Sequence, residues 1–362
     1  MINQYFPDYI LIKTDKSVLK ISEIKEGDKV DSPFGLGLVG HEEVLKIDKL
    51  EYDSTIVCLK LENGANIDFI PECPIFVRKN EAPWMVYVMY KKNMGFRVGV
   101  TKGNSDQRKL GSNSKSRLAH EAADKMWIIY NCESRNQAQF LEQKISVTYG
   151  FPTWVFTDRQ SGGNSYQQQD IDKLFKEVDT YKSFERLAQD FSLVFNYPHY
   201  QPQATTLGAG RTKVNLRYFN DNRYTSNKSS SLHRISIDTG NLEAVELISA
   251  NGLKIRKGKA KTLRHVSYSK DFKKILMRAK ELEKHGMIIE ETADLLGDGY
   301  FQLVINSGSV LPGWSVFIKN SEEKLEAIRV VKKEFKTYKG FVYGLTIKNT
   351  ACYLPNNVVV SN

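Results

Sequence analysis

The chain has 362 residues, of which 41% are hydrophobic and 26% are charged, and this is enough to bury the cores of two or three domains. No apolar run approaches the roughly 18 residues that a membrane span needs, and the polar start MINQYFPDY is unlike a signal peptide. The four cysteines show no CxxC spacing. This argues against a zinc ribbon or a disulfide framework and favours reduced thiols in a cytoplasm.

Both ends of the chain read as β-structure. Short alternating apolar and polar runs predict strands, and the glycines at Gly27 and Gly64 predict turns between them. The predicted strands are residues 10–14, 18–21, 29–32, 54–62 and 65–70 near the start, and 300–305, 314–318, 326–331, 340–347 and 356–361 near the end.

The apolar residues in the middle of the chain recur at a different spacing. Residues 86–101 predict a β-hairpin that turns at Asn93-Met94-Gly95. Apolar residues then recur at helical spacing in 117–130, 135–149 and 271–285. An α/β centre between two β-rich ends indicates that one domain is inserted into another.

The positive charge is concentrated in one segment. The net charge is +10, and the window from Arg211 to Arg264 holds twelve Lys and Arg against four Asp and Glu, which gives +8. This predicts a polyanionic partner. A solvated surface is the alternative that charge alone leaves open.

The two ends resemble Hint (Hedgehog/intein) domains. LKISEIKEGDKV, residues 19–30, resembles the strand-and-turn phrase near the start of these domains. SVLPGWSVFI and the final 21 residues resemble their C-terminal blocks. The resemblance implies one compact β-fold made from two segments that are distant in the sequence.

The positions that carry protein splicing in this family are changed here. The place of the first nucleophile falls near Tyr5, the Thr-x-x-His motif falls on Ile70 and Cys73, and the expected aspartate is Gly344. The two later histidines are replaced by Ala351 and Ser361, and the closing asparagine, Asn362, is the one residue retained. Since Ile70 donates no side-chain hydrogen bond and Cys73 is a poor substitute for an imidazole, we expect splicing to be absent.

The hairpin and the segment after it resemble GIY-YIG nucleases. Met85-Val86-Tyr87 matches the first triplet of that family, and Arg97-Val98-Gly99 matches the second. Arg97, Arg117 to Asp124, and Glu142 to Phe156 also resemble phrases in nuclease-like inserts of inteins from superfamily-1 DNA helicases. Such inteins imply a bacterial or phage-infected cell as the setting.

The resemblance implies roles for five residues. Tyr87 would act at the attacking water, Arg117 would hold the phosphate, and Glu142 would bind Mg²⁺ or Mn²⁺ through hard oxygen ligands. Glu121 lies one helical turn after Arg117 and is expected to orient its guanidinium. Arg97 stands where the family has its second tyrosine.

The basic segment interleaves Arg and Lys with Tyr and Phe, as DNA-binding surfaces do. We expect it to extend the DNA contact of a small nuclease domain. The candidate contacts are Arg211, Lys213, Arg217, Arg223, Lys254, Arg256, Lys257, Lys259, Lys261 and Arg264. The histidines at 199, 233 and 265 have no metal-ligand spacing, which favours a structural or DNA-facing role over zinc.

Together these observations predict an α+β protein. An all-β Hint domain, residues 1–80 and 300–362, is split by a GIY-YIG nuclease domain at 83–158 and a basic DNA-recognition region at 160–298. The predicted function is metal-dependent, sequence-specific cleavage of double-stranded DNA by a monomer, without a small-molecule substrate. A decayed protein that only binds DNA is the alternative, and a splicing-competent intein is a third.

Overall fold

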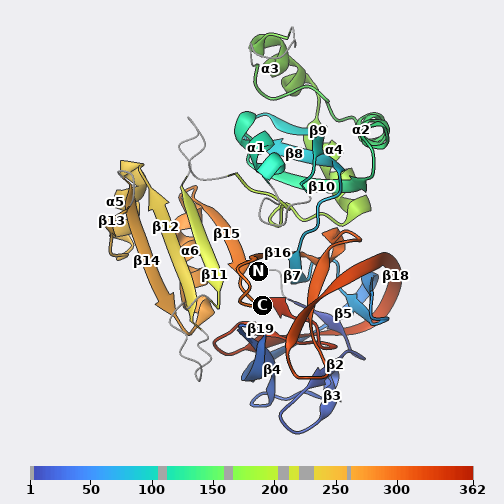
Figure 1. The fold of residues 1–362 in the computed structure, drawn as a ribbon, viewed down its shortest axis with the longest axis vertical. Coiled ribbons are helices and arrows are strands. Elements are labelled where there is room, and N and C mark those ends of the chain that lie inside the picture. The colour runs from blue at the N-terminus through green and yellow to red at the C-terminus, as the bar shows by residue number, and fades with distance from the viewer. Residues whose placement is uncertain are drawn as a thin grey trace. The chain divides into compact units, whose positions relative to one another are not determined.

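The computed structural model describes residues 4–104, 112–158, 166–202, 212–219, 232–258 and 262–361. The chain forms two compact units. Met1–Lys79 and Arg211–Asn362 make the first, here called the shell unit, and Asn80–Gly210 makes the second, here called the insert unit (Figure 1). Within the described ranges, no helix is long and apolar enough to cross a membrane.

The two ends of the chain build one part of the shell unit. Its strands are β1 (Phe6–Pro7), β2 (Leu11–Lys13), β3 (Val18–Lys20), β4 (Lys29–Gly35), β5 (Leu38–Leu61), β6 (Asn66–Phe69), β7 (Pro74–Arg78), β16 (Gln302–Asn306), β17 (Ser315–Lys319), β18 (Leu325–Ile347), β19 (Cys352–Tyr353) and β20 (Val360–Ser361). Phe6, Phe69 and Tyr353 meet in its core, where the ring of Phe6 lies 5.8 Å from each of the other two. Segments from both ends of the sequence therefore share one hydrophobic core.

The strands β5 and β18 are longer than the sequence predicts. The expected strands 326–331 and 340–347 are parts of one strand, β18, and β5 begins at Leu38. The two pair antiparallel from Val330 opposite Leu61 to Ile347 opposite Val44. Their middle parts are polar and largely exposed. The ladder between them is therefore held by backbone hydrogen bonds and by cross-strand ion pairs, such as Lys339 with Asp53 and Glu334 with Lys60, rather than by a buried face.

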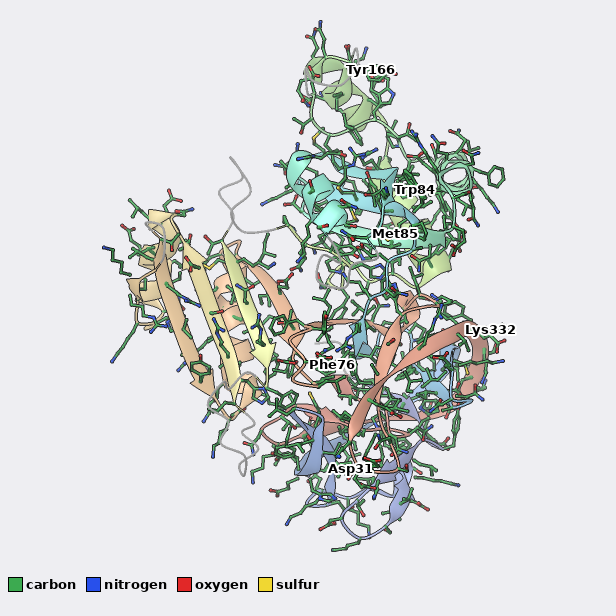
Figure 2. The ribbon with its side chains drawn as sticks, in the orientation of Figure 1. Asp31, Phe76, Trp84, Met85, Tyr166 and Lys332 are labelled. Carbon is green, nitrogen blue, oxygen red and sulfur yellow. The ribbon has the colours of Figure 1, made fainter. Side chains whose placement is uncertain are left out.

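A second part of the shell unit contains most of the basic segment. Its elements are β11 (Lys213–Tyr218), β12 (His233–Thr239), α5 (Leu242–Ala250), β13 (Arg256–Lys257), β14 (Leu263–Ser269), α6 (Phe272–Lys284) and β15 (Ile288–Ala293). The strand order is β13-β14-β12-β11-β15, and β15 continues the sheet into β16 and β7. Phe76 of β7, labelled in Figure 2, packs edge-on against Tyr218 with ring centroids 5.1 Å apart.

This arrangement differs from the expected region 160–298. Its later part shares one sheet with the shell, whereas its earlier part, up to 202, belongs to the insert unit. The reason lies in two sets of contacts that the sequence does not reveal. Thr292 and Ala293 pair with β16, and Phe184 stacks on Phe96 of the hairpin at 4.2 Å.

The insert unit is a three-stranded sheet with helices. Its elements are β8 (Trp84–Lys91), β9 (Gly95–Lys102), α1 (Ser112–His120), β10 (Lys125–Cys132), α2 (Arg135–Tyr149), α3 (Gln168–Glu177) and α4 (Thr180–Phe191). The strand order is β10-β8-β9, and Figure 2 marks the start of β8 at Trp84 and Met85. The predicted hairpin is confirmed, with positive φ values of 68° at Asn93 and 105° at Gly95 in its turn.

The predicted helix 117–130 is wrong in its second half. Helix α1 ends at His120, Ala122 has a left-handed φ of 49°, and β10 follows. Residues Met126 to Ile129 are all buried. A continuous apolar run of this kind fits a fully buried strand as well as a helix, so periodicity alone does not separate the two.

The other two predicted helices are confirmed. In α2 the Ser134 side chain accepts a hydrogen bond from the Gln137 amide, and Gly150 ends the helix with a left-handed φ of 83°. In α6 the Asp271 carboxylate accepts from the Lys273 amide.

Candidate active site and nucleic-acid interface

The hairpin brings Tyr87 and Arg97 together across adjacent strands. Tyr87 on β8 lies opposite Gly99 on β9, and a Cβ atom at Gly99 would lie 2.4 Å from the Tyr87 hydroxyl and 3.0 Å from Arg97 Nη2. The hydroxyl and the guanidinium therefore occupy the space above a residue that has no side chain.

Arg97 is the centre of a buried polar cluster. Its Nη1 donates to the Tyr87 hydroxyl at 2.9 Å and to Glu121 Oε1 at 2.8 Å, and its Nη2 donates to the Thr153 carbonyl at 2.8 Å. The other oxygen of Glu121 accepts from the Phe156 amide at 3.1 Å. Residues that the sequence resemblance assigns to a site are thus in direct contact, although Glu121 pairs more closely with Arg97 than with Arg117, contrary to the expectation.

Burial sets the electrostatics of this cluster. The side chain of Tyr87 is fully buried, and desolvation raises the pKa of its hydroxyl above the usual value. Burial also opposes the charge of Arg97, but Tyr87 and Glu121 outweigh it and leave the pKa of the guanidinium raised. Arg97 is therefore a fixed cation that holds the tyrosine hydroxyl in place.

Arg117 and Glu142 lie nearer to solvent. The Arg117 side chain is 42% exposed and its Nη1 lies 3.9 Å from Glu121 Oε1. Glu142, on α2, is half-buried, and desolvation raises the pKa of its carboxyl while Arg97 and Arg117 partly oppose the rise. The catalytic candidates therefore lie in one region of the insert unit. Arg97 contacts Tyr87 and Glu121, Arg117 lies near Glu121, and both arginines act on the pKa of Glu142.

The residues present fit a divalent cation that is shared with a substrate phosphate. Within the described ranges, no three His, Cys, Asp or Glu side chains gather to form a cage for a metal ion. Mg²⁺, however, is commonly held through one or two carboxylates together with substrate phosphates and water. Glu142 offers such a carboxylate. Glu121 is the less suitable of the two glutamates, since both of its oxygens already accept hydrogen bonds.

Gly99 provides a test of this packing. Gly99→Ala is expected to lower the free energy of unfolding by about 1–3 kcal/mol, because the new methyl group overlaps Tyr87 and Arg97. Urea unfolding measures the loss. The matched control is Gly240→Ala, since a Cβ atom there meets nothing within 4 Å. Equal stability of the two variants would contradict the close approach.

The predicted DNA contacts lie in several surroundings. Lys213 is buried in an ion pair with Glu290 at 2.6 Å, and Arg217 lies over the Phe301 ring at 3.6 Å. Arg264 lies 4.0 Å from Asp238. The exposed members are Lys254, Arg256 and Lys257. Arg211, Arg223, Lys259 and Lys261 are outside the described residues.

The histidines at 199, 233 and 265 have structural surroundings, as expected. His199 Nδ1 accepts from the Ile128 amide at 2.9 Å. His265 hydrogen-bonds to the Lys254 carbonyl and the Ser267 hydroxyl, both at 2.9 Å. Burial lowers the pKa of His233 to about 3.

The positions at which the sequence resemblance places the splicing residues are packed into the shell unit. A Cβ atom at Gly344 would lie 2.5 Å from the Gln4 carbonyl oxygen and 3.2 Å from the Tyr5 ring, so there is no room for an aspartate. The side chains of Ile70, Cys73 and Ala351 are buried, and desolvation raises the pKa of the Cys73 thiol well above its usual value.

The last described residue of the chain is also held in place. Ser361 lies opposite Cys352 in the β19–β20 ladder, and its hydroxyl shares a hydrogen bond of 2.7 Å with that of Tyr218. Asn362 lies outside the described residues.

Some contributors to these sites were missed from the sequence. Thr153 and Phe156 contribute backbone groups, which leave no mark on residue type. Arg234 is a different case, because it alternates with His233 and Ile235 on β12. That alternation is a visible signal that Arg234 faces away from the core.

Comparisons with known proteins give a partial likeness. No protein-family model and no curated protein matches the chain. Among solved structures, the gp41-1 intein is 22% identical, and the match covers 26% of this chain and 72% of that one with a TM-score of 0.18. A triple-substituted variant of the gp41-1 intein is 20% identical, with the same coverage and a TM-score of 0.19. Scores this low do not place the chain in a family.

Proposed function

We propose that this chain is a metal-dependent DNA endonuclease of the GIY-YIG type, housed in an intein-like Hint domain that has lost protein splicing. The main support is the convergence of Tyr87, Arg97, Glu121, Arg117 and Glu142 in the insert unit. We place it in the cytoplasm of a bacterial or phage-infected cell, in keeping with four cysteines that are all free and buried.

Each residue of the cluster has its own role in the proposed hydrolysis of a phosphodiester. A water oxygen attacks phosphorus and releases one proton to solvent, and the bond to the leaving oxygen breaks as that oxygen takes up a proton from solvent. Arg117, whose planar fork suits phosphate oxygens, binds the scissile phosphate and stabilises the charge that develops on it. Glu142 would hold a Mg²⁺ or Mn²⁺ ion, which would neutralise phosphate charge. Arg97 holds the Tyr87 hydroxyl in place through a hydrogen bond of 2.9 Å.

Cleavage of a duplex library of randomised sequence tests the proposal. With Mg²⁺ we expect cuts at a recurring sequence, and Arg117→Gln is expected to slow them about 10²–10³-fold because a phosphate donor is lost. The control Lys115→Gln removes a charge from the same helix and is expected to cut like the wild type. Cuts that are equally fast in both variants would contradict the role of Arg117.

A second candidate function is DNA binding without cleavage. It is favoured by the burial of Tyr87, whose hydroxyl is engaged with Arg97 and has no exposure to water in this structure. A chain that binds the library but leaves it intact would support this candidate.

The shell is expected to leave flanking sequences in place. A fusion with a protein segment at each end should keep its full mass during incubation, because Gly344 leaves no room for an acid and Cys73 is a buried, protonated thiol. Mass spectrometry of the intact fusion measures this. A product that has lost one or both flanks would show that splicing or terminal cleavage persists.

A further inference from the structure

The basic part of the shell unit presents a polar face opposite helix α6. The ring of Phe272 on α6 stacks on Tyr218 at 3.7 Å and contacts His233 at 5.3 Å, and α6 lies behind the strands in Figure 1. Since successive side chains alternate between faces, Arg217 and Arg234 point to the other side. We call that side the arginine face.

Strand register sorts the arginine face into three rows. The first row is Arg217, Arg234 and Tyr268, the middle row is Asn215, Ser236 and Val266, and the third row is Asp238, Arg264 and Arg256. Arg264 precedes Tyr268 by four residues on β14, so the outer rows are about 13 Å apart along the strand. Two rows of net positive charge thus flank a row that holds the polar side chains of Asn215 and Ser236 beside Val266.

Like charges lie directly opposite each other on this face. Arg217 faces Arg234, and Arg256 faces Arg264. Such pairs destabilise a sheet. The cost is visible in Arg217, whose pKa is lowered by burial and by the charge of Arg234, while Asp294 and Glu290 oppose the fall. Only Asp238 and Glu290 contribute negative charge among the residues of these rows and their β15 neighbours.

We propose that the arginine face binds double-stranded DNA across a groove, with the two outer rows on the two phosphate backbones and Asn215 and Ser236 facing the base edges. The inference rests on the proposed function in taking DNA as the partner, and it adds the binding mode and three unassigned residues, Arg234, Asn215 and Ser236. Phosphate groups would neutralise the arginines of this face, and this would remove the repulsion between the like charges that lie opposite each other.

The dimensions and chemistry of the arginine face favour a duplex. The rows are spaced at about the 12 Å width of the major groove. Single strands are bound by stacking bases on aromatic side chains, whereas the rows hold one aromatic residue, Tyr268. Asparagine and serine are side chains that hydrogen-bond base edges.

Duplex binding by the full chain tests the proposal. Anisotropy of a labelled mixed-sequence duplex, measured with EDTA over a range of salt, reports affinity without cleavage. The double variant Arg217→Gln/Arg234→Gln is expected to bind at least about tenfold more weakly and to lower the slope of log K against log salt by about two. The control Arg278→Gln, on the exposed side of α6, is expected to bind like the wild type.

Two further readouts separate binding from folding and from catalysis. The double variant is expected to unfold at about the same urea concentration as the wild type, because removal of the like-charge pair offsets the lost contact between Arg217 and the Phe301 ring. Asn215→Ala is expected to keep the salt slope and to change the preference among sequences. Unchanged duplex affinity in the double variant, or tighter binding to the single strand of the same sequence, would overturn the proposal. Because the assay excludes metal, it measures binding alone. A chain that never cuts DNA can still show the predicted binding, and a chain that cuts DNA can still lack it, so the two proposals fail separately.

Discussion

Replacing Glu142 with glutamine is expected to slow DNA cleavage by at least about 10²-fold, while leaving duplex binding in EDTA and the free energy of unfolding nearly unchanged. The carboxylate is half-buried beside two arginines and lies in the same electrostatic cluster as Tyr87. Glutamine keeps the shape but removes the charge that a hard cation needs. The initial rate of cutting with Mg²⁺ measures the effect.

The control for this variant is Glu133→Gln. Glu133 is exposed just before α2, so its replacement changes the net charge by the same amount at a site outside the cluster. Equal loss of activity in both variants would assign the effect to overall charge and contradict the role of Glu142.

The acid side of the pH profile gives an independent check. Burial raises the pKa of Glu142, and the carboxylate must be ionised to hold a cation. The cutting rate is therefore expected to fall, as the pH is lowered, at a higher pH than an ordinary glutamate would give. The cutting rate, measured from about pH 5 to pH 8 at a DNA concentration well below saturation, shows this fall on the acid side. A flat profile over that range would contradict it.

Replacing Arg97 with methionine is expected to cost about 3–5 kcal/mol of unfolding free energy, because it leaves the carboxylate of Glu121 buried without its cation. The side chains of Arg97 and Glu121 are 5% and 4% exposed. Urea unfolding followed by tryptophan fluorescence measures the loss, since three of the four tryptophans, Trp84, Trp127 and Trp154, lie in the insert unit.

A double variant separates lost charge pairing from lost packing. Arg97→Met/Glu121→Leu removes both charges and is expected to recover much of the stability, since a buried ion pair is often replaceable by apolar side chains of similar volume. A single variant that costs less than about 1 kcal/mol would show that Arg97 does not hold the cluster together.

The hairpin and two helices were predictable because their signals are local. Alternation on both sides of Asn93 and Gly95 fixes the hairpin, and the apolar stripe of α6 with its cap at Asp271 fixes that helix. Strand β10 was not predictable, since a short run that is buried on both sides has no period of its own. The β5–β18 ladder depends on a partner hundreds of residues away.

The sequence names the candidate residues of the site through the family resemblance, but it does not give their contacts. Residue types and order marked Tyr87 and Glu142, whereas Arg97 looked like a departure from the family pattern. Its place as the buried partner of Glu121 depends on the fold of three separate segments. The backbone amide of Phe156 has no signature in the sequence at all.

Sequencing the ends of a randomised duplex library after incubation with Mg²⁺ tests the central claim most directly. The wild-type chain is predicted to leave new ends at a recurring sequence, and Glu142→Gln is predicted to leave none above background. A wild-type chain that binds the duplex but leaves every molecule intact, with Mg²⁺ and with Mn²⁺, would contradict the endonuclease and support a protein that only binds DNA.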